Sequence, residues 1–363
     1  MKVLITGAHF TPAAATIEQL KKISRADIIY IGRTTTREGD EAKSVESQVL
    51  PKMGVKFIPI IAGRLQRQLT VFTIPSLLKI PIGFMQALFF ILREQPDVIL
   101  SFGGYVAVPV VVAGWLFSVP VIIHEQTLLS GLANRISALF ADKIAVSFQN
   151  TFKGEKVILT GNPIRPEVVQ KPVSKTKLPT ILVMGGNQGS HVINLAVEQC
   201  LQKLLKIANV YHQTGDSKFK DYERLERWSG DPVSSAGKYQ IKKWIGEEYP
   251  EVLSRADLVV SRAGINTLSE LALLGKPALL IPISNREQNK NASFFEGLGL
   301  SKTLPQSKLS GEELLKNIKQ MLNNLSFLKQ KAKEAGKVII PDAAKRLALE
   351  TLLLSKSKTE PAL

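Results

Sequence analysis

Two polar loops, each placed after a short apolar run, carry side chains that could accept a proton. His9 closes the loop that follows Val3–Ile5, and Glu125 comes after the apolar run 119–123. An imidazole beside a helix N-terminus stays neutral near pH 7 and suits a general base. We therefore take His9 as the first candidate base and Glu125 as the second. The alternative for His9 is a histidine that only caps a turn.

Three loops that contain glycine could bring the backbone close to a ligand, and two of them, 184–190 and 261–270, could bind phosphate groups. They comprise residues 101–105, 184–190 and 261–270, and each follows an apolar run and precedes an expected helix. Glycine lets the backbone approach a ligand closely, and the first amides of a helix bind anions. None of these loops has the spacing of a P-loop or of a dinucleotide-binding motif, so neither kind of site is predicted.

The third loop ends in a glutamate with two possible roles. Glu270 lies three residues after Thr267, which is the spacing of a helix capping box. Its carboxylate could instead accept hydrogen bonds from ribose hydroxyls, and we favour this role. No Asp-x-Asp motif follows a strand and Cys200 is the only cysteine, so the sequence predicts no bound metal and no cofactor.

Parallel sheets are needed to position these loops. Strands are expected at 2–5, 27–31, 55–61, 98–102, 119–123, 143–147 and 156–160, and again at 180–184, 207–213, 238–244, 257–260, 278–281 and 301–304. Helices are expected at 12–24, 82–94, 106–117, 132–140, 190–206, 267–274, 289–298, 310–334 and 341–355. Alternating strands and helices indicate doubly wound α/β domains, which bind ligands at the carboxyl ends of their strands. The segment 161–166, with two prolines and a glycine, separates two such series.

The charge of the chain indicates which kinds of molecule it could bind. The formal net charge of +16, spread over both halves of the 363 residues, points to nucleic acid, a membrane surface or phosphate-bearing ligands, or only to solvated lysines. No recognised nucleic-acid motif supports the first of these. Val98–Ile123 carries no charge and is long enough to span a bilayer, but glycines and prolines interrupt it. We expect strand, loop, buried helix and strand there.

Seven motifs occur in the order found in one known family. The chain resembles the MurG family, the UDP-N-acetylglucosamine:undecaprenyl-pyrophosphoryl-N-acetylmuramyl-pentapeptide N-acetylglucosaminyltransferases, from about residue 3 to about 340. The motifs are Gly103-Gly104-Tyr105, His124-Glu125-Gln126, Gly131-x-x-Asn134-Arg135, Gly161-Asn162-Pro163-x-Arg165, Gly185-Gly186-x-Gln188-Gly189, Tyr211-His212-Gln213-Thr214-Gly215 and Arg262-x-Gly264-x-x-Thr267-x-x-Glu270.

The resemblance implies an inverting glycosyltransferase of the GT-B fold, with two Rossmann-like domains facing each other across a cleft. Residues 1–161 would form the acceptor and membrane-facing domain, and residues 162–340 the UDP-sugar-binding domain. A helix and polar tail at 341–363 would pack back on the first domain. The implied reaction converts lipid I to lipid II for peptidoglycan, at the cytoplasmic face of the inner membrane. Partners would be UDP-N-acetylglucosamine, lipid I, an anionic membrane surface, and cell-division and cell-wall enzymes.

The resemblance also implies site residues. His9 and Glu125 are the catalytic candidates, and the acceptor loop is Gly103, Gly104 and Tyr105. The substrate-binding residues would be Thr6, Gly7, Ala8, Thr127, Asn134, Arg165, Asn187, Gln188, Ile245, Ile265, Asn266, Thr267, Leu268, Ser269, Glu270 and Gln288. The chain departs from the family pattern in three loops. The first loop lacks the leading Gly-Gly of the family and has Ala8 in place of a glycine, while Thr127 replaces an asparagine and Asn187 a serine.

Other functions stay open at this point. The chain could be another UDP-sugar:lipid transferase of the same fold, a sugar epimerase, or a relative that binds nucleotide sugars without catalysis.

For membrane contact we single out residues 64–85, where Arg64, Arg67 and Lys79 accompany many apolar residues and no acidic residue occurs. Pro75 and Pro81 are expected to break this segment.

Overall fold

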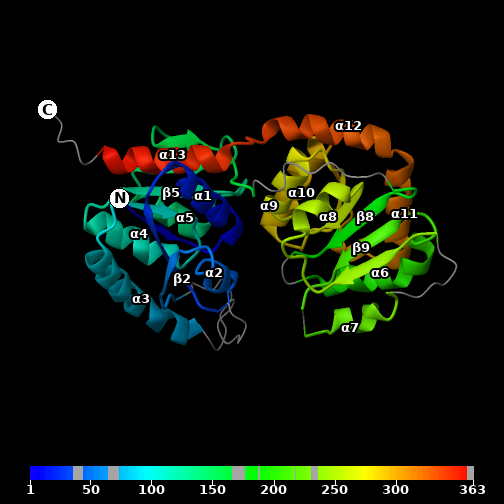
Figure 1. The fold of residues 1–363 in the computed structure, drawn as a ribbon, viewed down its shortest axis with the longest axis horizontal. Coiled ribbons are helices and arrows are strands. Elements are labelled where there is room, and N and C mark those ends of the chain that lie inside the picture. Colours follow the sequence, from blue (N-terminus) through cyan, green and yellow to red (C-terminus); the bar gives the residue numbers. More distant parts are fainter. Residues whose placement is uncertain are drawn as a thin grey trace. The chain divides into compact units, whose positions relative to one another are not determined.

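The computed structural model describes residues 1–35, 44–63, 73–165, 176–186, 189–216, 218–229 and 236–357, without the side chains of 73–77. The chain divides into two compact units (Figure 1). Unit 1 comprises Met1–Arg165 together with Ile340–Leu363, and unit 2 comprises Pro166–Ile339. Each unit is a parallel α/β sheet with helices on both faces, as the alternating pattern predicts.

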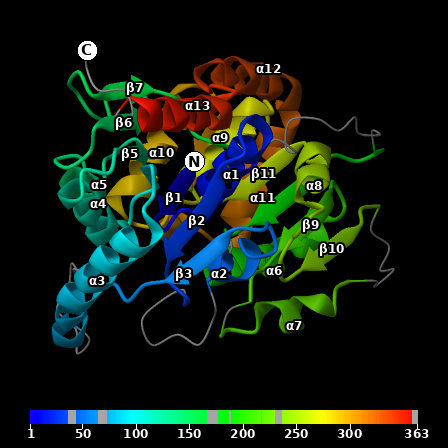
Figure 2. The same cartoon turned by 60° about the vertical axis from the view of Figure 1, so that its left-hand side comes forward.

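Unit 1 contains a sheet of seven strands in the order β3-β2-β1-β4-β5-β6-β7, and Figure 2 labels all of these strands except β4. All of its strand pairs are parallel. The central strands are apolar and buried on both sides, as expected for a covered parallel sheet. The strands are β1 (Lys2–Thr6), β2 (Asp27–Gly32), β3 (Lys56–Pro59), β4 (Val98–Ser101), β5 (Val121–Glu125), β6 (Lys143–Val146) and β7 (Val157–Leu159).

Helices cover both faces of this sheet. The helices are α1 (Phe10–Ile23), α2 (Val45–Val49), α3 (Thr73–Glu94), α4 (Ala107–Leu116), α5 (Leu132–Ser137) and α13 (Ala343–Lys356). One apolar core joins α1 and α13 to the sheet, and a second joins α3 and α4 to its other face. The last helix of the chain therefore packs in unit 1, against α1, β4 and β5.

The helix α3 corrects one expectation. We expected the prolines to prevent a helix before residue 82. Instead, α3 begins at Thr73 and continues through Pro81. A proline inside a helix lacks one amide, and its ring also crowds the carbonyl of the residue four positions earlier. Packing of the later residues Ala87 and Ile91 in the core helps to offset this cost. The uncharged run 98–123 forms β4, a loop, α4 and the start of β5, as expected. Among the described residues, no helix is both long enough and apolar enough to cross a membrane.

Unit 2 contains six parallel strands in the order β10-β9-β8-β11-β12-β13. The strands are β8 (Thr180–Met184), β9 (Asn209–Gln213), β10 (Tyr239–Lys242), β11 (Leu258–Ser261), β12 (Ala278–Leu280) and β13 (Ser301–Thr303). The helices are α6 (His191–Leu204), α7 (Asp221–Glu226), α8 (Tyr249–Arg255), α9 (Ile265–Leu273), α10 (Arg286–Gly297), α11 (Gly311–Asn323) and α12 (Leu325–Ala335), with short 3-10 turns at Gln306–Lys308 and Gly336–Val338.

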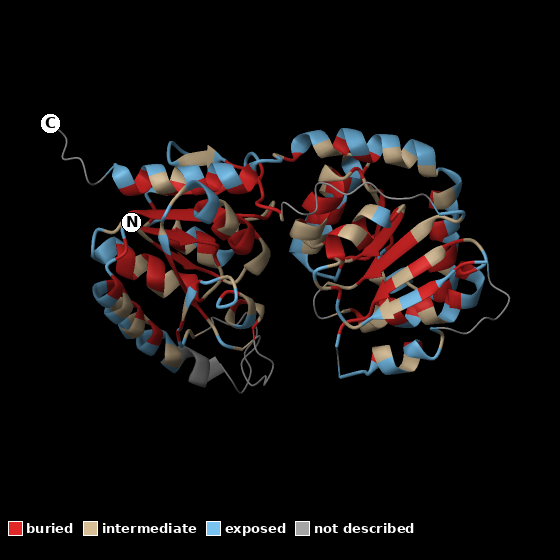
Figure 3. Ribbon diagram, viewed as in Figure 1, coloured by how far each residue is buried: buried red, intermediate tan, exposed pale blue. Residues whose placement is uncertain are grey.

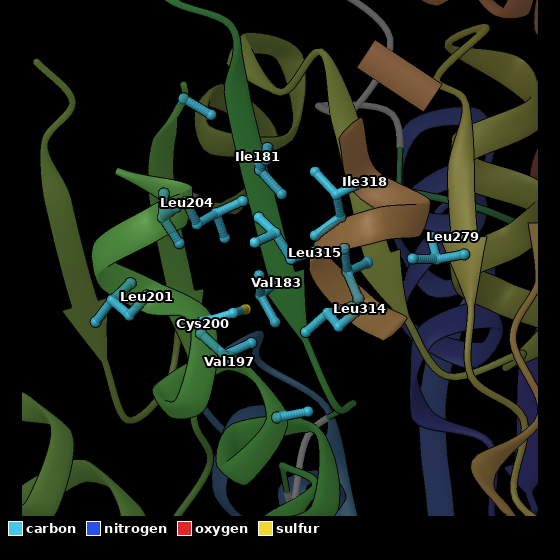
Figure 4. Packing of buried hydrophobic residues seen from close by; sticks show 14 of the residues in the cluster. Ile181, Val183, Val197, Cys200, Leu201, Leu204, Leu279, Leu314, Leu315 and Ile318 are labelled. Atoms are coloured by element: carbon cyan, nitrogen blue, oxygen red, sulfur yellow. The ribbon is translucent and has the colours of Figure 1, made fainter. Parts of the chain in front are cut away.

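One core of unit 2 lies between its sheet and the helices α6 and α11 (Figure 4). Val197, Cys200 and Leu204 of α6 and Leu314 and Ile318 of α11 pack on the buried strand residues. Colouring by burial shows the strands of both units as largely buried and the outer sides of the helices as exposed (Figure 3). Cys200 is a core residue, and burial raises its thiol pKa to about 11.

Every expected strand is present, whereas several helices differ. The helices α2, α7 and α8 were not expected, because five to seven residues make too few turns for a periodic pattern. The segment 310–334 is two helices, with Asn324 between them. His124 and Glu125, expected just after a strand, are the last two residues of β5 itself.

Candidate functional site

The first candidate loop of unit 1 is locked to the neighbouring strand end. Thr6 accepts a backbone bond from Phe102 (2.8 Å), and the amide of Ala8 donates to Gly103 O (3.0 Å). The Thr6 hydroxyl is buried and donates to Ile31 O (2.9 Å). A side chain at Gly7, which has φ 141°, would lie 2.9 Å from the Phe102 backbone. Thr6 and Gly7 therefore shape the loop, and their backbone is what a ligand could contact.

The two glycines of the loop 103–105 pack tightly on the same region. Gly103 and Gly104 both have left-handed backbone conformations, with φ 70° and 81°. A Cβ at Gly103 would lie 2.5 Å from Asn134 Oδ1, and one at Gly104 would lie 2.6 Å from the Ala8 methyl group. Ala8, which replaces a family glycine, is accommodated because Gly104 leaves room for it.

His9 lies at the N-cap of α1, and its side chain caps no helix amide. This contradicts the alternative of a histidine that caps a turn. Part of its surface stays accessible, but the protein encloses the imidazole enough that desolvation lowers its pKa to about 4, with the charge of Arg33 as the second cause. Neutral imidazole is therefore the form present at pH 7.

Arg33 connects three adjacent strand ends. It follows β2, and its Nη1 donates to the hydroxyl of Tyr105 (3.3 Å), which follows β4. Its guanidinium lies 5.9 Å from the Tyr105 ring centre. Because β1 lies between β2 and β4 in the sheet, this contact passes beside the loop that carries His9.

Glu125 is a buried carboxylate whose two oxygens are both occupied. Oε1 accepts from the amide (3.0 Å) and the hydroxyl (2.8 Å) of Thr127. Oε2 accepts from Gly131 N (3.1 Å) and Asn134 Nδ2 (2.9 Å). The side chain is only 2% exposed. Glu125 therefore holds the segment 127–134 in place, and Thr127 and Asn134 direct polar atoms toward it.

The remaining unit 1 candidates lie near the same edge of the sheet. His124 is fully buried, its Nε2 lies 3.0 Å from Gly161 O, and burial lowers its pKa to about 4. Arg165 is half-buried at the end of unit 1. The structure thus brings together His9, the 103–105 loop, Glu125, Thr127 and Asn134 at the carboxyl edge of one sheet.

In unit 2, the glycine loop after β8 is built on close backbone contacts. A Cβ at Gly189 would lie 1.8 Å from Thr214 O, and one at Gly185 would lie 2.3 Å from Ser190 N. Gly186 and Gly189 both have positive φ. Asn187 and Gln188, two predicted substrate-binding residues, lie outside the described residues.

The helix α9 begins two residues earlier than expected, with Gly264 as its N-cap. No side chain caps it, so the capping box of Thr267 and Glu270 is not formed. The first helical bond is donated by Leu268 to Gly264 O, so the amides of residues 265–267 have no acceptor within the helix. The N-terminal end of α9 is therefore a candidate anion-binding site.

Other predicted residues of α9 face the protein. Leu268 is buried, and the Ser269 hydroxyl donates to Ile265 O (2.9 Å). Glu270 is 2% exposed, and its Oε2 accepts from the Tyr249 hydroxyl at 2.7 Å. Tyr249, the first residue of α8, therefore fixes the orientation of the Glu270 carboxylate.

Two further predicted residues of unit 2 are held by backbone contacts. The Gln288 carbonyl oxygen accepts from Ile283 N (3.0 Å) and Ala263 N (3.3 Å), which leaves the amide NH₂ as its group for a ligand. Ile245 is buried, and its amide donates to Gln213 Oε1 (3.0 Å). Ile245, the segment 265–270 and Gln288 all follow carboxyl ends of unit 2 strands.

Four residues at these edges were not singled out from the sequence as site residues: Arg33, Gln213, Trp244 and Tyr249. Gln213 lies in one of the family motifs, and the exposed Trp244 precedes Ile245, a predicted binding residue. The sequence therefore contained some indication of both residues. Arg33 and Tyr249 act through partners distant in sequence, which no local pattern reveals. Within the described parts of both units, no group of three or more His, Cys, Asp or Glu is placed to hold a metal ion.

Comparison with known families identifies both units. The glycosyltransferase family 28 N-terminal domain matches residues 6–146, and the glycosyltransferase family 28 C-terminal domain matches residues 180–347. The chain belongs to glycosyltransferase family 28. It is a glycosyltransferase of the GT-B fold, which confirms the expected fold class and family.

Curated relatives match along nearly the whole chain. The UDP-N-acetylglucosamine--N-acetylmuramyl-(pentapeptide) pyrophosphoryl-undecaprenol N-acetylglucosamine transferase of Clostridium botulinum (strain Kyoto / Type A2) is 34% identical, over 89% of this chain and 91% of its own. The enzyme of the same name from Bacillus cytotoxicus is 34% identical, over 96% and 97%.

Solved structures agree on the fold. Acinetobacter baumannii MurG superposes with a TM-score of 0.73 at 24% identity, covering 97% of this chain and 99% of that one. The calicheamicin glycosyltransferase CalG4 superposes with a TM-score of 0.72 at 13% identity, covering 99% of each chain. At these identities the likeness shows the fold alone.

The bonding of Glu125 yields a first prediction. In Glu125→Gln one carboxylate oxygen becomes an NH₂ group, which would face two donors. We expect the free energy of unfolding to fall by about 1–3 kcal/mol, as for buried donors left without acceptors. Chemical denaturation measures this.

Glu350→Gln is the matched control, because Glu350 forms a half-exposed ion pair with Lys143 (2.7 Å) and should cost less. If Glu125→Gln keeps full stability and loses turnover, Glu125 is a catalytic group and its structural role is wrong.

Proposed function

We propose that this chain is an inverting glycosyltransferase that moves N-acetylglucosamine from UDP-N-acetylglucosamine to the N-acetylmuramyl sugar of lipid I, giving lipid II for peptidoglycan. The observation that carries this proposal is 34% identity to curated enzymes of that name across both units. The test is turnover by purified protein with lipid I and UDP-N-acetylglucosamine. UDP binding without turnover would instead support a non-catalytic relative, and turnover with another UDP-sugar would indicate a different transferase.

Unit 2 is the donor-binding domain in this proposal. The amides of residues 265–267 would bind the phosphates, Glu270 the ribose hydroxyls and the Gln288 NH₂ group the sugar. The start of α9 at Ile265, the bond from Tyr249 to Glu270 and the bonded Gln288 carbonyl support these roles. Ile245 would lie beside the base. Asn187 and Gln188 remain expected near the phosphates on sequence grounds.

Unit 1 is the acceptor-binding domain, with His9 as the base. Its neutral imidazole takes the proton of the acceptor hydroxyl as that oxygen attacks the anomeric carbon, and the bond from this carbon to the UDP oxygen breaks. The helix amides of α9 and the Arg165 guanidinium stabilise the charge that collects on the leaving diphosphate. Glu125 is less suited to be the base, because its four hydrogen bonds already use both oxygens.

The site for a membrane lies on the outer side of α3. Leu78, Ile82, Met85, Phe89 and Leu92 are exposed and recur every three or four residues, which places them along one stripe. The opposite side of the same helix packs Ala87 and Ile91 in the core. Exposed Trp115, Leu116 and Phe117 end the neighbouring helix α4.

An apolar stripe of this size on a chain with charge +16 fits peripheral binding to an anionic bilayer. The acceptor is lipid-linked, so we propose that unit 1 rests on the cytoplasmic face of the inner membrane through α3 and the end of α4. The expected face, 64–85, overlaps this stripe only at 78–85. Arg64 and Arg67 lie outside the described residues.

For the base, we expect His9→Ala to lower kcat by about 10²-fold or more and to leave donor binding unchanged. Because the pKa of His9 is about 4, kcat/KM should stay level from pH 8 to pH 5.

A second variant tests the charge beside His9. Arg33→Gln removes a positive charge, so the pKa of His9 should rise, and the fall of kcat/KM on the acid side of the pH profile should move to higher pH. Arg346→Gln, which alters a surface pair with Asp342, is the control. A wild-type limb near pH 6.5 would contradict this environment for His9.

For the ribose contact, Glu270→Ala should raise the donor KM about 10- to 100-fold, the loss of a charge-assisted hydrogen bond. It should also erase discrimination against a 2′-deoxyribose donor. Tyr249→Phe is the control for stability, because it removes the same 2.7 Å bond but keeps the carboxylate. A lower melting temperature with unchanged KM and unchanged discrimination would rule out the ribose role.

For the membrane, Met85→Glu with Phe89→Glu should abolish most co-sedimentation with phosphatidylglycerol vesicles and leave the donor Kd unchanged. These side chains are 64% and 57% exposed, so the fold should tolerate the change. Leu349→Glu with Leu353→Glu has the same spacing on α13 of the same unit and should sediment like the unaltered protein. Equal loss in both double variants would mean that added negative charge, rather than this face, controls binding.

A further inference from the structure

Gln213 occupies the position in unit 2 where two donor loops come within reach of one side chain. It is the last residue of β9, and β9 lies between β8 and β10. In the ladder it pairs with Met184, after which the glycine loop begins, and with Lys242, which precedes the loop to Ile245. The parallel register therefore places Gln213 beside the starts of both loops.

The amide of Gln213 bonds to each of these loops once. Nε2 donates to Gly186 O at 3.0 Å, and Oε1 accepts from Ile245 N at 3.0 Å. The residue is only 3% exposed. Its orientation is determined, because only Nε2 can donate to a carbonyl and only Oε1 can accept from an amide.

These bonds also decide which backbone groups stay available to a ligand. Gly186 O accepts from Gly189 N (3.0 Å) as well as from Gln213, so this carbonyl is directed into the protein. A carbonyl oxygen facing a phosphate would repel it. On the other loop, the Ile245 amide already donates to Gln213, and Ile245 is 2% exposed.

We propose that Gln213 is a positioning residue of the donor site: without touching the nucleotide, it holds the glycine loop and the Ile245 loop in the relative arrangement that binds UDP. The proposal rests on the assignment of unit 2 as the donor domain. It gives a role to the 211–215 motif, which the sequence singled out without one. A buried glutamine that only stabilises the fold is the competing explanation.

The test compares UDP binding with stability in two variants. Gln213→Met keeps the size of the side chain and loses both bonds. We expect the Kd for UDP, measured by calorimetry, to rise about tenfold or more, and the donor KM to rise with it. The acceptor KM should not change, because the acceptor binds unit 1.

Gln199→Met is the matched control. Gln199 also bonds a backbone amide, that of Gly311 at 2.8 Å, but it joins α6 to α11 away from the donor loops. It should lower the melting temperature without changing the Kd for UDP. Equal UDP affinity in Gln213→Met and Gln199→Met would overturn the proposal.

Gln213→Glu adds a readout that a purely structural residue would not give, and it serves if Gln213→Met does not fold. A carboxylate can still accept from Ile245 N but repels Gly186 O, whereas its protonated form can donate to Gly186 O as the amide does. UDP affinity of this variant, relative to wild type at the same pH, should recover as pH falls. A pH-independent ratio would contradict the proposal. If the wild-type protein binds UDP but does not turn over lipid I, the proposed function fails while this inference stands.

Discussion

Parallel pairing of strands is the constraint on which the candidate site depends. In a parallel sheet all strands point the same way, so their carboxyl ends lie at one edge and their following loops meet there. Thr6 pairs with Ser101 in unit 1, and Gln213 pairs with both Met184 and Lys242 in unit 2. Residues separated by tens of positions in sequence are brought into hydrogen-bonding distance by these registers alone.

The polar groups at the two edges divide into those that build the loops and those that remain for ligands. Glu125, Ser269 and the Gln288 carbonyl are bonded within the protein. Glu125 and Gln288 hold loop residues, whereas Ser269 bonds to the first turn of its own helix α9. The groups proposed for ligands are mostly backbone, such as the first amides of α9, together with the His9 imidazole. Such preorganised donors cost little rearrangement when charge develops during a reaction.

The helix α3 serves two environments at once. Its inner residues fill the core of unit 1, whereas its outer stripe of large apolar side chains stays exposed. Exposed apolar stripes of this kind often mark interaction surfaces, so this stripe is the observation on which the proposed membrane contact rests. Arg93, whose guanidinium lies 5.4 Å from the Phe89 ring centre, adds a cation beside the stripe.

The sequence by itself determined the alternation of strands and helices, the two-series organisation and the positions of the glycine loops. These follow from local apolar periodicity and from glycine and proline, which act within a few residues. It did not determine where α3 begins, because the helix passes through Pro81 and is stabilised by residues such as Ala87 and Ile91 that pack in the core, and such packing is a tertiary property. Nor did it decide between His9 and Glu125, or between a capping and a ligand role for Glu270. Those choices depend on partners such as Thr127, Asn134 and Tyr249, and only the folded sheet edges bring them together.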